Sequence, residues 1–198
     1  LDITEDIDAY FNTAQHGIYR KIPLKNNVTR LDGKTTSNRA KITNLSVNSN
    51  YETSRSRDFY EIRIGSQDKV LTGAQHYTIK YTYKLFKDTI KDYDELYFNI
   101  IGDQWDTVIG NVSFTITMPK DFDEQKLGFS AGSYGSSDST NVSYNVDGKT
   151  ITGSYDGILN RNEALTIRCE LPEGYFSASK SLFVDVEFLS LIHISEPT

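Results

Sequence analysis

The chain has 198 residues, a net charge of −6, 37% hydrophobic and 12% aromatic residues, and a single cysteine. This length allows a core that needs no disulfide or metal, and one cysteine excludes an internal disulfide. Basic residues are scattered along the sequence, which argues against nucleic acid as a partner and against direct binding to an anionic membrane surface. Abundant tyrosine and phenylalanine favour β-structure, because aromatic side chains fit a pleated, half-buried surface.

Alternation of apolar and polar residues predicts strands along most of the chain. The clearest pattern covers residues 75–85, where every second side chain is apolar, and it predicts a strand with one buried and one wet face. Further strands are predicted at 3–11, 16–23, 40–48, 59–65, 112–118, 142–152, 163–172 and 181–189. The imperfect alternation of 40–48 predicts a bulge. The charged segment 51–58 is expected to be a loop.

Two polar segments are interpreted by their turn residues. Residues 26–38 are expected to form an exposed hairpin or a long loop. In the hairpin predicted at 142–152, Asp147-Gly148 favours a type I′ turn.

Residues 94–105 combine an apolar and aromatic run with the only tryptophan. We predict a core strand that ends in a corner at Gly102-Asp103 and seats Trp105 in the core. About ten strands and no convincing amphipathic helix predict an all-β fold, an antiparallel β-sandwich, as a single domain over residues 1–188.

Both ends of the sequence carry an expectation of their own. The chain opens inside an alternating pattern, so we expect the first strand to be truncated. Residues 189–198 resemble the translation of a sequencing adapter, and we interpret them as non-native and leave them out of fold reasoning. The competing interpretation is a genuine final strand.

Several motifs occur in an order that resembles one family. They include Ile3-Thr-Glu5, His16-Gly-Ile-Tyr-Arg-Lys-Ile-Pro23, Ile62-Arg-Ile-Gly65, Gly73 to Tyr81, Glu95 to Trp105, Val112 to Pro119 and Leu171 to Phe176. With them the chain resembles the extracytoplasmic N-terminal domain of predicted bacterial membrane proteins of unknown function, the YciQ-like family. The resemblance marks His16, Gly17, Arg20, Pro23, Gly65, Gly102, Asp103 and Trp105 as structural motif residues.

The resemblance implies topology rather than chemistry. A β-rich domain would lie on the outer side of the cell membrane, anchored through segments absent from this chain. The family supplies no catalytic residues, so none is assigned, and no cofactor is expected.

Candidate site residues are each weighed against a structural role. The carboxylates of Asp94 or Glu95 and of Asp103 flank one strand and would lie about 25 Å apart, too far for a glycosidase pair. Asp103 and Asp106 are weak calcium candidates. Asp103 is expected instead to accept hydrogen bonds from backbone amides at its corner.

The remaining polar residues do not form a recognisable catalytic or metal-binding motif. Cys169 is in phase with apolar neighbours and is expected to be buried and inert. Neither His16 nor His76 has zinc ligands at suitable spacing, and His76 is expected on a wet face. Arg20 is expected to form an ion pair with a strand carboxylate, with recognition of an anionic ligand as the alternative.

Exposed tyrosines supply the sharper binding hypothesis. They could form a flat sugar-binding face, and the candidates are Tyr93, Tyr97, Tyr134, Tyr144 and Tyr155. The sequence thus favours a non-catalytic extracytoplasmic domain with a structural or protein-interaction role. A carbohydrate- or cell-wall-binding module is the first alternative, and an envelope hydrolase is the second.

Overall fold

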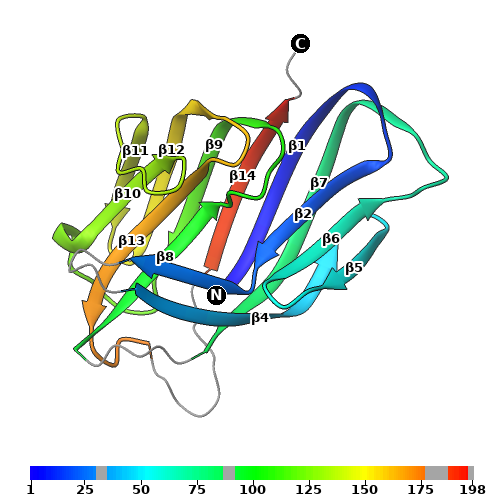
Figure 1. Cartoon of the computed structure of the whole chain (residues 1–198). Coiled ribbons are helices and arrows are strands. Elements are labelled where there is room, and N and C mark those ends of the chain that lie inside the picture. The colour runs from blue at the N-terminus through cyan, green and yellow to red at the C-terminus, as the bar shows by residue number, and fades with distance from the viewer. Residues whose placement is uncertain (30–34, 87–91, 177–186, 196–198) are drawn as a thin grey trace.

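The computed structural model describes residues 1–29, 35–86, 92–176 and 187–195. Eight strands form one large sheet, and two three-stranded sheets cover one face of it (Figure 1). In spatial order the large sheet contains β11 (Val142–Asp147), β12 (Thr150–Leu159), β9 (Val108–Thr117), β14 (Glu187–Ser195), β1 (Asp2–Gln15), β7 (Leu71–Leu85), β4 (Thr35–Val47) and β3 (Lys25–Thr29).

The small sheets are built from strands that alternate along the chain with those of the large sheet. One contains β10 (Leu127–Gly132), β13 (Ala164–Pro172) and β8 (Tyr93–Ile101). The other contains β2 (Gly17–Pro23), β6 (Phe59–Gly65) and β5 (Tyr51–Arg55). A 3-10 turn, η1 (Glu124–Lys126), is the helical element of the described part of the chain.

The predicted all-β antiparallel sandwich is confirmed. Strand neighbours pair antiparallel, with the exception of β1 and β14, which pair parallel. The described residues form fourteen strands rather than about ten, because β3, β5 and β10 lie in segments for which no separate strand was predicted and the 142–152 hairpin contributes two.

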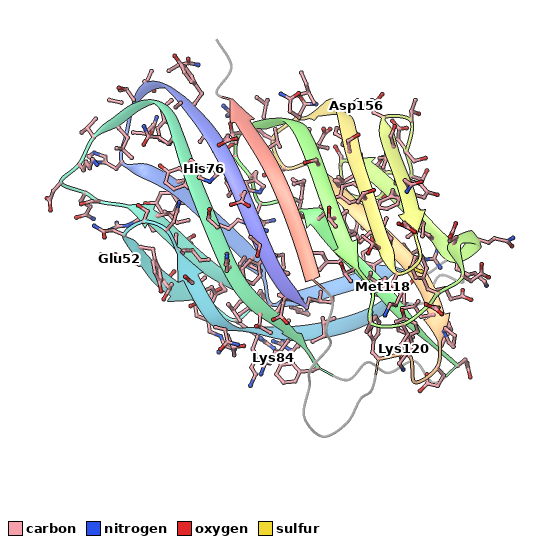
Figure 2. The ribbon with its side chains drawn as sticks, turned by 180° about the vertical axis from the view of Figure 1, so that it is seen from behind. Glu52, His76, Lys84, Met118, Lys120 and Asp156 are labelled. Atoms are coloured by element: carbon pink, nitrogen blue, oxygen red, sulfur yellow. The ribbon has the colours of Figure 1, made fainter. Side chains whose placement is uncertain are left out.

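Burial follows the alternation of the sequence and places the core between the large sheet and the two small ones. On β7, Tyr77, Ile79 and Tyr81 are at most 3% exposed, whereas His76 and Lys80 face solvent. Figure 2 shows the opposite side of the molecule, where the polar outer face of the large sheet lies in view. Each small sheet therefore buries one face of its own against the same large sheet.

Two local predictions are wrong for identifiable reasons. Residues 51–55, expected to be loop, form the edge strand β5, whose five side chains are all exposed, so no alternation marked it. In the hairpin of β11 and β12, Asp147 pairs with Thr150, so the central turn residues are Gly148 and Lys149. A positive φ occurs at Gly148 (+58°) and not at Asp147, which does not fit a type I′ turn centred on Asp147-Gly148.

The bulge predicted in the 40–48 strand is confirmed. The register of β4 against β7 shifts between Thr43 and Ser46, and Asn44 adopts a positive φ of 54°. The tip of the expected hairpin (30–34) and the start of the predicted 181–189 strand lie outside the described residues. Residues 187–195 pair with β1 and β9, while the interpretation of 189–198 as non-native stays a prediction.

Candidate functional site

Three polar side chains meet between the large sheet and the β2-β6-β5 sheet, and we name Glu5, Arg20 and Tyr81 the inner cluster. Arg20 of β2 donates from Nε to Glu5 Oε2 at 2.7 Å and from Nη2 to Glu5 Oε1 at 2.8 Å. Tyr81 Oη donates to the same Oε1 at 2.7 Å. Arg20 is 3% exposed and Glu5 1%. The expected ion pair of Arg20 is thus a buried, bidentate one.

Contacts within the inner cluster raise the pKa values of Arg20 and Tyr81. Burial lowers the pKa of Arg20, but the charge of Glu5 and the hydrogen bonds to it outweigh burial and raise the pKa above its ordinary value. Burial, together with the neighbouring Glu5 carboxylate, raises the pKa of Tyr81 well above its ordinary range. Arg20 therefore keeps its charge and Tyr81 keeps its proton near neutral pH.

The corner after β8 packs on this guanidinium. The ring of Trp105 lies 5.4 Å from Arg20 Cζ in a cation–π contact, and Trp105 is 4% exposed. At Gly102 an added Cβ would lie 3.3 Å from Arg20 Nη1, so the main chain approaches the guanidinium closely. The prediction that Trp105 is seated in the core is confirmed. Its neighbour Arg20 lies on β2, the edge strand of the β2-β6-β5 sheet.

Gly17 and Gly65 face each other at the far end of β2. They are paired in register, with φ of +136° and +134°. A Cβ at Gly17 would lie 1.8 Å from the Ile64 carbonyl oxygen, and one at Gly65 would lie 1.9 Å from that of His16. Both contacts are with main chain, so no side-chain rotation relieves them, and these positions require glycine.

The imidazole of His16 lies beside this glycine pair. His16 Nδ1 lies 3.3 Å from the carbonyl oxygen of Ser66 and 3.2 Å from that of Lys69. Those contacts tie the start of β2 to the loop after β6. His16 therefore has a local structural role in the described part of the chain.

A cleft of about 690 Å³ opens between the two small sheets, and we name it the inter-sheet cleft. Arg20, Ile22 and Pro23 line it from β2, and Tyr81 and Tyr83 line it from β7. The opposite wall comes from β8, β10 and β13, the corner after β8 and the turn after β10. Its volume lies within the roughly 300–1,000 Å³ typical of ligand sites.

The walls of the inter-sheet cleft offer aromatic rings and hydrogen-bonding side chains, most of which are neutral. The rings exposed most are Tyr97 (41%) and Tyr134 (86%). The hydrogen-bonding side chains at its wall on the β8 side are Asn99, Asp103, Gln104, Ser130, Ser133, Ser136 and Thr166.

Arg20, Pro23, Gly102 and Asp103 are the predicted motif residues that reach this cleft. Asp103 differs from expectation, because its Oδ1 accepts a hydrogen bond from Gln104 Nε2 at 3.1 Å rather than from backbone amides. The other calcium candidate, Asp106, forms an ion pair with Arg161 at 3.6 Å. Within the described ranges, no three His, Cys, Asp or Glu side chains gather in a metal-binding arrangement.

The sequence did not single out Glu5 as a partner of Arg20. The sequence nevertheless indicates that Glu5 is buried, because it falls in phase with Ile3 and Ile7 of β1. A charged residue on the apolar phase of a strand is a buried group that requires a partner.

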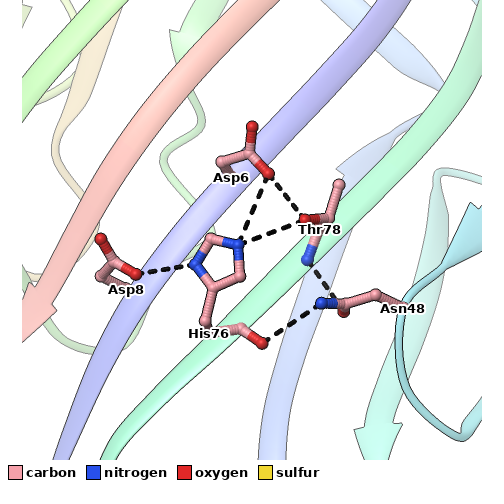
Figure 3. Close-up of polar contacts among 5 residues, drawn as sticks. All are labelled: Asp6, Asp8, Asn48, His76 and Thr78. Carbon is pink, nitrogen blue, oxygen red and sulfur yellow. Dashed lines mark hydrogen bonds and ion pairs between the residues drawn. The ribbon is translucent and has the colours of Figure 1, made fainter.

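A second polar cluster lies on the outer face of the large sheet, again on β1 and β7. We name Asp6, Asp8, His76 and Thr78 the outer cluster (Figure 3). His76 Nδ1 lies 2.7 Å from Asp8 Oδ1, its Nε2 lies 3.8 Å from Asp6 Oδ1, and Thr78 Oγ1 donates to Asp6 Oδ1. The His76 side chain is 53% exposed, as expected for a wet face. Asn48 of the neighbouring turn accepts from the amide of Thr78.

Cys169 lies inside β13 and is fully buried. Burial, followed by the charges of Asp123 and Glu170, raises its pKa to about 11. Little thiolate exists near neutral pH, and the expected buried orientation is confirmed.

The expected flat tyrosine face does not form. Tyr155 is 8% exposed and lies in the core, and the half-exposed ring of Tyr144 lies 4.8 Å from that of Phe129 at a tilt of 45°. Tyr97 and Tyr134 are the members that share the inter-sheet cleft.

Fold and site together define an all-β domain with a cleft between two sheets that pack on a third. A family model described as the N-terminal domain of a predicted membrane protein (DUF2207) matches residues 1–169. The chain belongs to this family, as the ordered motifs predicted. No curated protein and no solved structure matches it. None of the described helical residues forms a helix long and apolar enough to cross a membrane.

Proposed function

We propose that the chain is a non-catalytic recognition domain of a membrane-anchored bacterial protein, held on the outer side of the cell membrane. The observation that carries the proposal is the inter-sheet cleft, whose walls present the exposed rings of Tyr97 and Tyr134 beside neutral polar side chains. The family, described as the N-terminal domain of a predicted membrane protein, supports the membrane attachment.

The chemistry of the cleft supports recognition over catalysis. Its described lining contains one carboxylate, Asp103, and no histidine or cysteine. Glycoside hydrolysis by the usual route needs two carboxyl groups, and general acid–base catalysis needs a group that titrates near the working pH. Arg20 holds its charge against Glu5, which leaves it as a support of the cleft rather than a reacting group.

Photocrosslinking tests the role of the cleft in the membrane-anchored protein. A photoreactive amino acid replaces Tyr134 in the cleft, and the matched control replaces Tyr10, which is 54% exposed on the outer face of β1. We expect discrete crosslinked products from position 134 that position 10 does not yield. Identical products from both positions, or none from 134, would overturn the recognition role.

A thiol probe tests the side of the membrane. Tyr10→Cys places an accessible thiol on a surface where the buried Cys169 does not compete. A maleimide that cannot cross membranes should label this variant in cells whose cytoplasmic membrane is intact. Labelling that occurs only after the membrane is broken would place the domain on the inner side.

A further inference from the structure

We propose that the inter-sheet cleft binds an uncharged oligosaccharide of the cell wall. The inference rests on the proposed recognition role and names the ligand class of the same site. Four features of the cleft support it. They are its exposed aromatic rings, its polar side chains, its lack of net charge, and the edge of β2, whose carbonyl groups already accept hydrogen bonds from side chains.

The aromatic rings are placed for stacking on sugar faces. Tyr97 lies on β8 and Tyr134 lies in the turn that follows β10, and both belong to the same wall of the cleft. Tyrosine combines a flat apolar face with a polar tip, which suits the alternating C–H and hydroxyl surfaces of a pyranose ring. These two rings present 41% and 86% of their surface to solvent in a site that also contains polar groups.

The turn that carries Tyr134 is ordered by its own hydrogen bonds. The Ser136 amide donates to the Ser133 carbonyl at 2.9 Å, and Ser136 Oγ donates to the Ala131 carbonyl at 2.7 Å. The Ala131 amide donates in turn to the Asp138 carbonyl at 2.7 Å. Tyr134 is thus presented to solvent on a turn whose main chain is already ordered. Binding of a ligand there would cost little conformational entropy of the main chain.

The polar groups match hydroxyl and amide partners. Gln104 Nε2 donates to Asp103 Oδ1, and Asn99 Oδ1 accepts from Thr166 Oγ1. An amide has two N–H donors and a carboxylate has a second oxygen, so these side chains keep further donors and acceptors of the kind that vicinal hydroxyls and N-acetyl groups require. The positive charge of Arg20 is cancelled by Glu5. The remaining charges of the described lining are Lys25 and Asp103, of opposite sign, so the cleft offers no net field to attract a polyanion.

The edge of β2 is unsuited to a peptide that would extend the sheet. Arg20 Nη1 donates to the Lys21 carbonyl at 2.6 Å, and Tyr83 Oη donates to the Pro23 carbonyl at 2.9 Å. These two carbonyls lie two residues apart and therefore on one side of the strand. Pro23 also lacks an amide donor. Side chains thus occupy the acceptors that an added strand would need.

Binding of defined sugars to the 198-residue chain tests the inference. The probes are soluble cello-oligosaccharides and chito-oligosaccharides, followed by calorimetry, and purified peptidoglycan sacculi, followed by sedimentation. We expect the wild type to bind at least one of the two soluble, uncharged oligosaccharide series. The double variant Tyr97→Ala/Tyr134→Ala should weaken that binding roughly tenfold or more, because two stacking contacts are lost.

Three controls make the test specific. Tyr10→Ala, on the outer face, should leave binding unchanged, and Tyr134→Phe, which keeps the ring, should retain most of it. The two cleft tyrosines are exposed, so the double variant should keep the melting temperature of the wild type. A matched melting temperature separates loss of binding from loss of fold.

The outcomes separate the ligand class from the recognition role. No binding to any uncharged probe, binding that the double variant keeps, or binding only to an anionic wall polymer would each overturn the sugar assignment. If position 134 still gives specific crosslinks to a protein, the recognition role stands and the ligand class is wrong. If the crosslinks are also absent, both proposals fail.

Discussion

Two polar clusters lie on opposite faces of the large sheet at β1 and β7, and the inner one also takes Arg20 from β2. The inner cluster pairs Arg20 with Glu5 through two short hydrogen bonds at 1–3% exposure. The outer cluster pairs His76 with Asp8 at one short contact, with side chains 53% and 40% exposed. The two pairs share β1, which supplies a carboxylate to each, and they lie in very different dielectric surroundings.

The comparison teaches where the fold depends on charge. Exposed ion pairs contribute little, because water already solvates each partner and salt screens them. A buried pair is not strongly stabilising compared with apolar residues, but breaking it leaves an uncompensated charge in the interior. The inner cluster should be intolerant of change at one member, and the outer cluster should tolerate it.

The largest effect is expected at Glu5. Glu5→Ala leaves the buried Arg20 guanidinium without its carboxylate and should lower the free energy of unfolding by about 3–5 kcal/mol. Urea denaturation measures the change. The double variant Glu5→Leu/Arg20→Met, which removes both charges, should recover most of the loss, and a double variant as unstable as the single one would contradict the buried-charge explanation.

Trp105→Ala should have an effect of nearly the same size. It removes a buried ring that packs on Arg20, and large-to-small changes of this kind cost about 3–5 kcal/mol. Thermal and urea unfolding of the variant would show the loss. An unchanged melting temperature would mean that the corner after β8 contributes no core packing.

Tyr81→Phe should have an intermediate effect that depends on pH. Loss of the hydroxyl removes one hydrogen bond to Glu5 and should cost about 1–2 kcal/mol at neutral pH. The raised pKa of Tyr81 means that above about pH 10 the phenol ionises in the unfolded chain before it does in the folded one. Wild-type stability should therefore fall as pH rises above 10, and Tyr81→Phe should show a shallower fall. Urea midpoints at pH 8 and 10.5 compare the two slopes, and equal slopes would contradict the prediction.

Asp8→Asn should have the smallest effect. The variant changes the carboxylate that contacts His76 Nδ1 on the outer face, and even a charged pair with this exposure contributes only about 0.2–1 kcal/mol. Raising the salt concentration should shrink the difference from the wild type further. A loss as large as that of Glu5→Ala would break the distinction between the two faces.

Alternation made much of this predictable. The phase of residues 75–85 identified which side chains of β7 are inside, including Tyr81, and which are outside, including His76. The apolar run of 94–105 identified Trp105 as a core residue. In both cases one strand's own pattern contained the information.

The parts that were missed depend on contacts between distant segments. β5 has no buried face and exists only because β6 pairs with it. The inter-sheet cleft draws residues from both small sheets, β7 of the large sheet and the turn after β10, so no local pattern marks it. Tyr155 lay beyond the predicted hairpin, which ended at residue 152, whereas β12 continues to Leu159 and keeps Tyr155 in phase with the buried Ile151.

The paired glycines Gly17 and Gly65 restrict how this domain can vary in evolution. A side chain at either position meets the main chain of the other strand, so a second mutation at the partner cannot make room for it. The separation of β2 and β6 at that point is therefore fixed. Arg20 follows three residues later on β2, so the same spacing limits how far its side chain extends into the core. Two glycines thus constrain the position of the buried Arg20, although neither of them contacts it through a side chain.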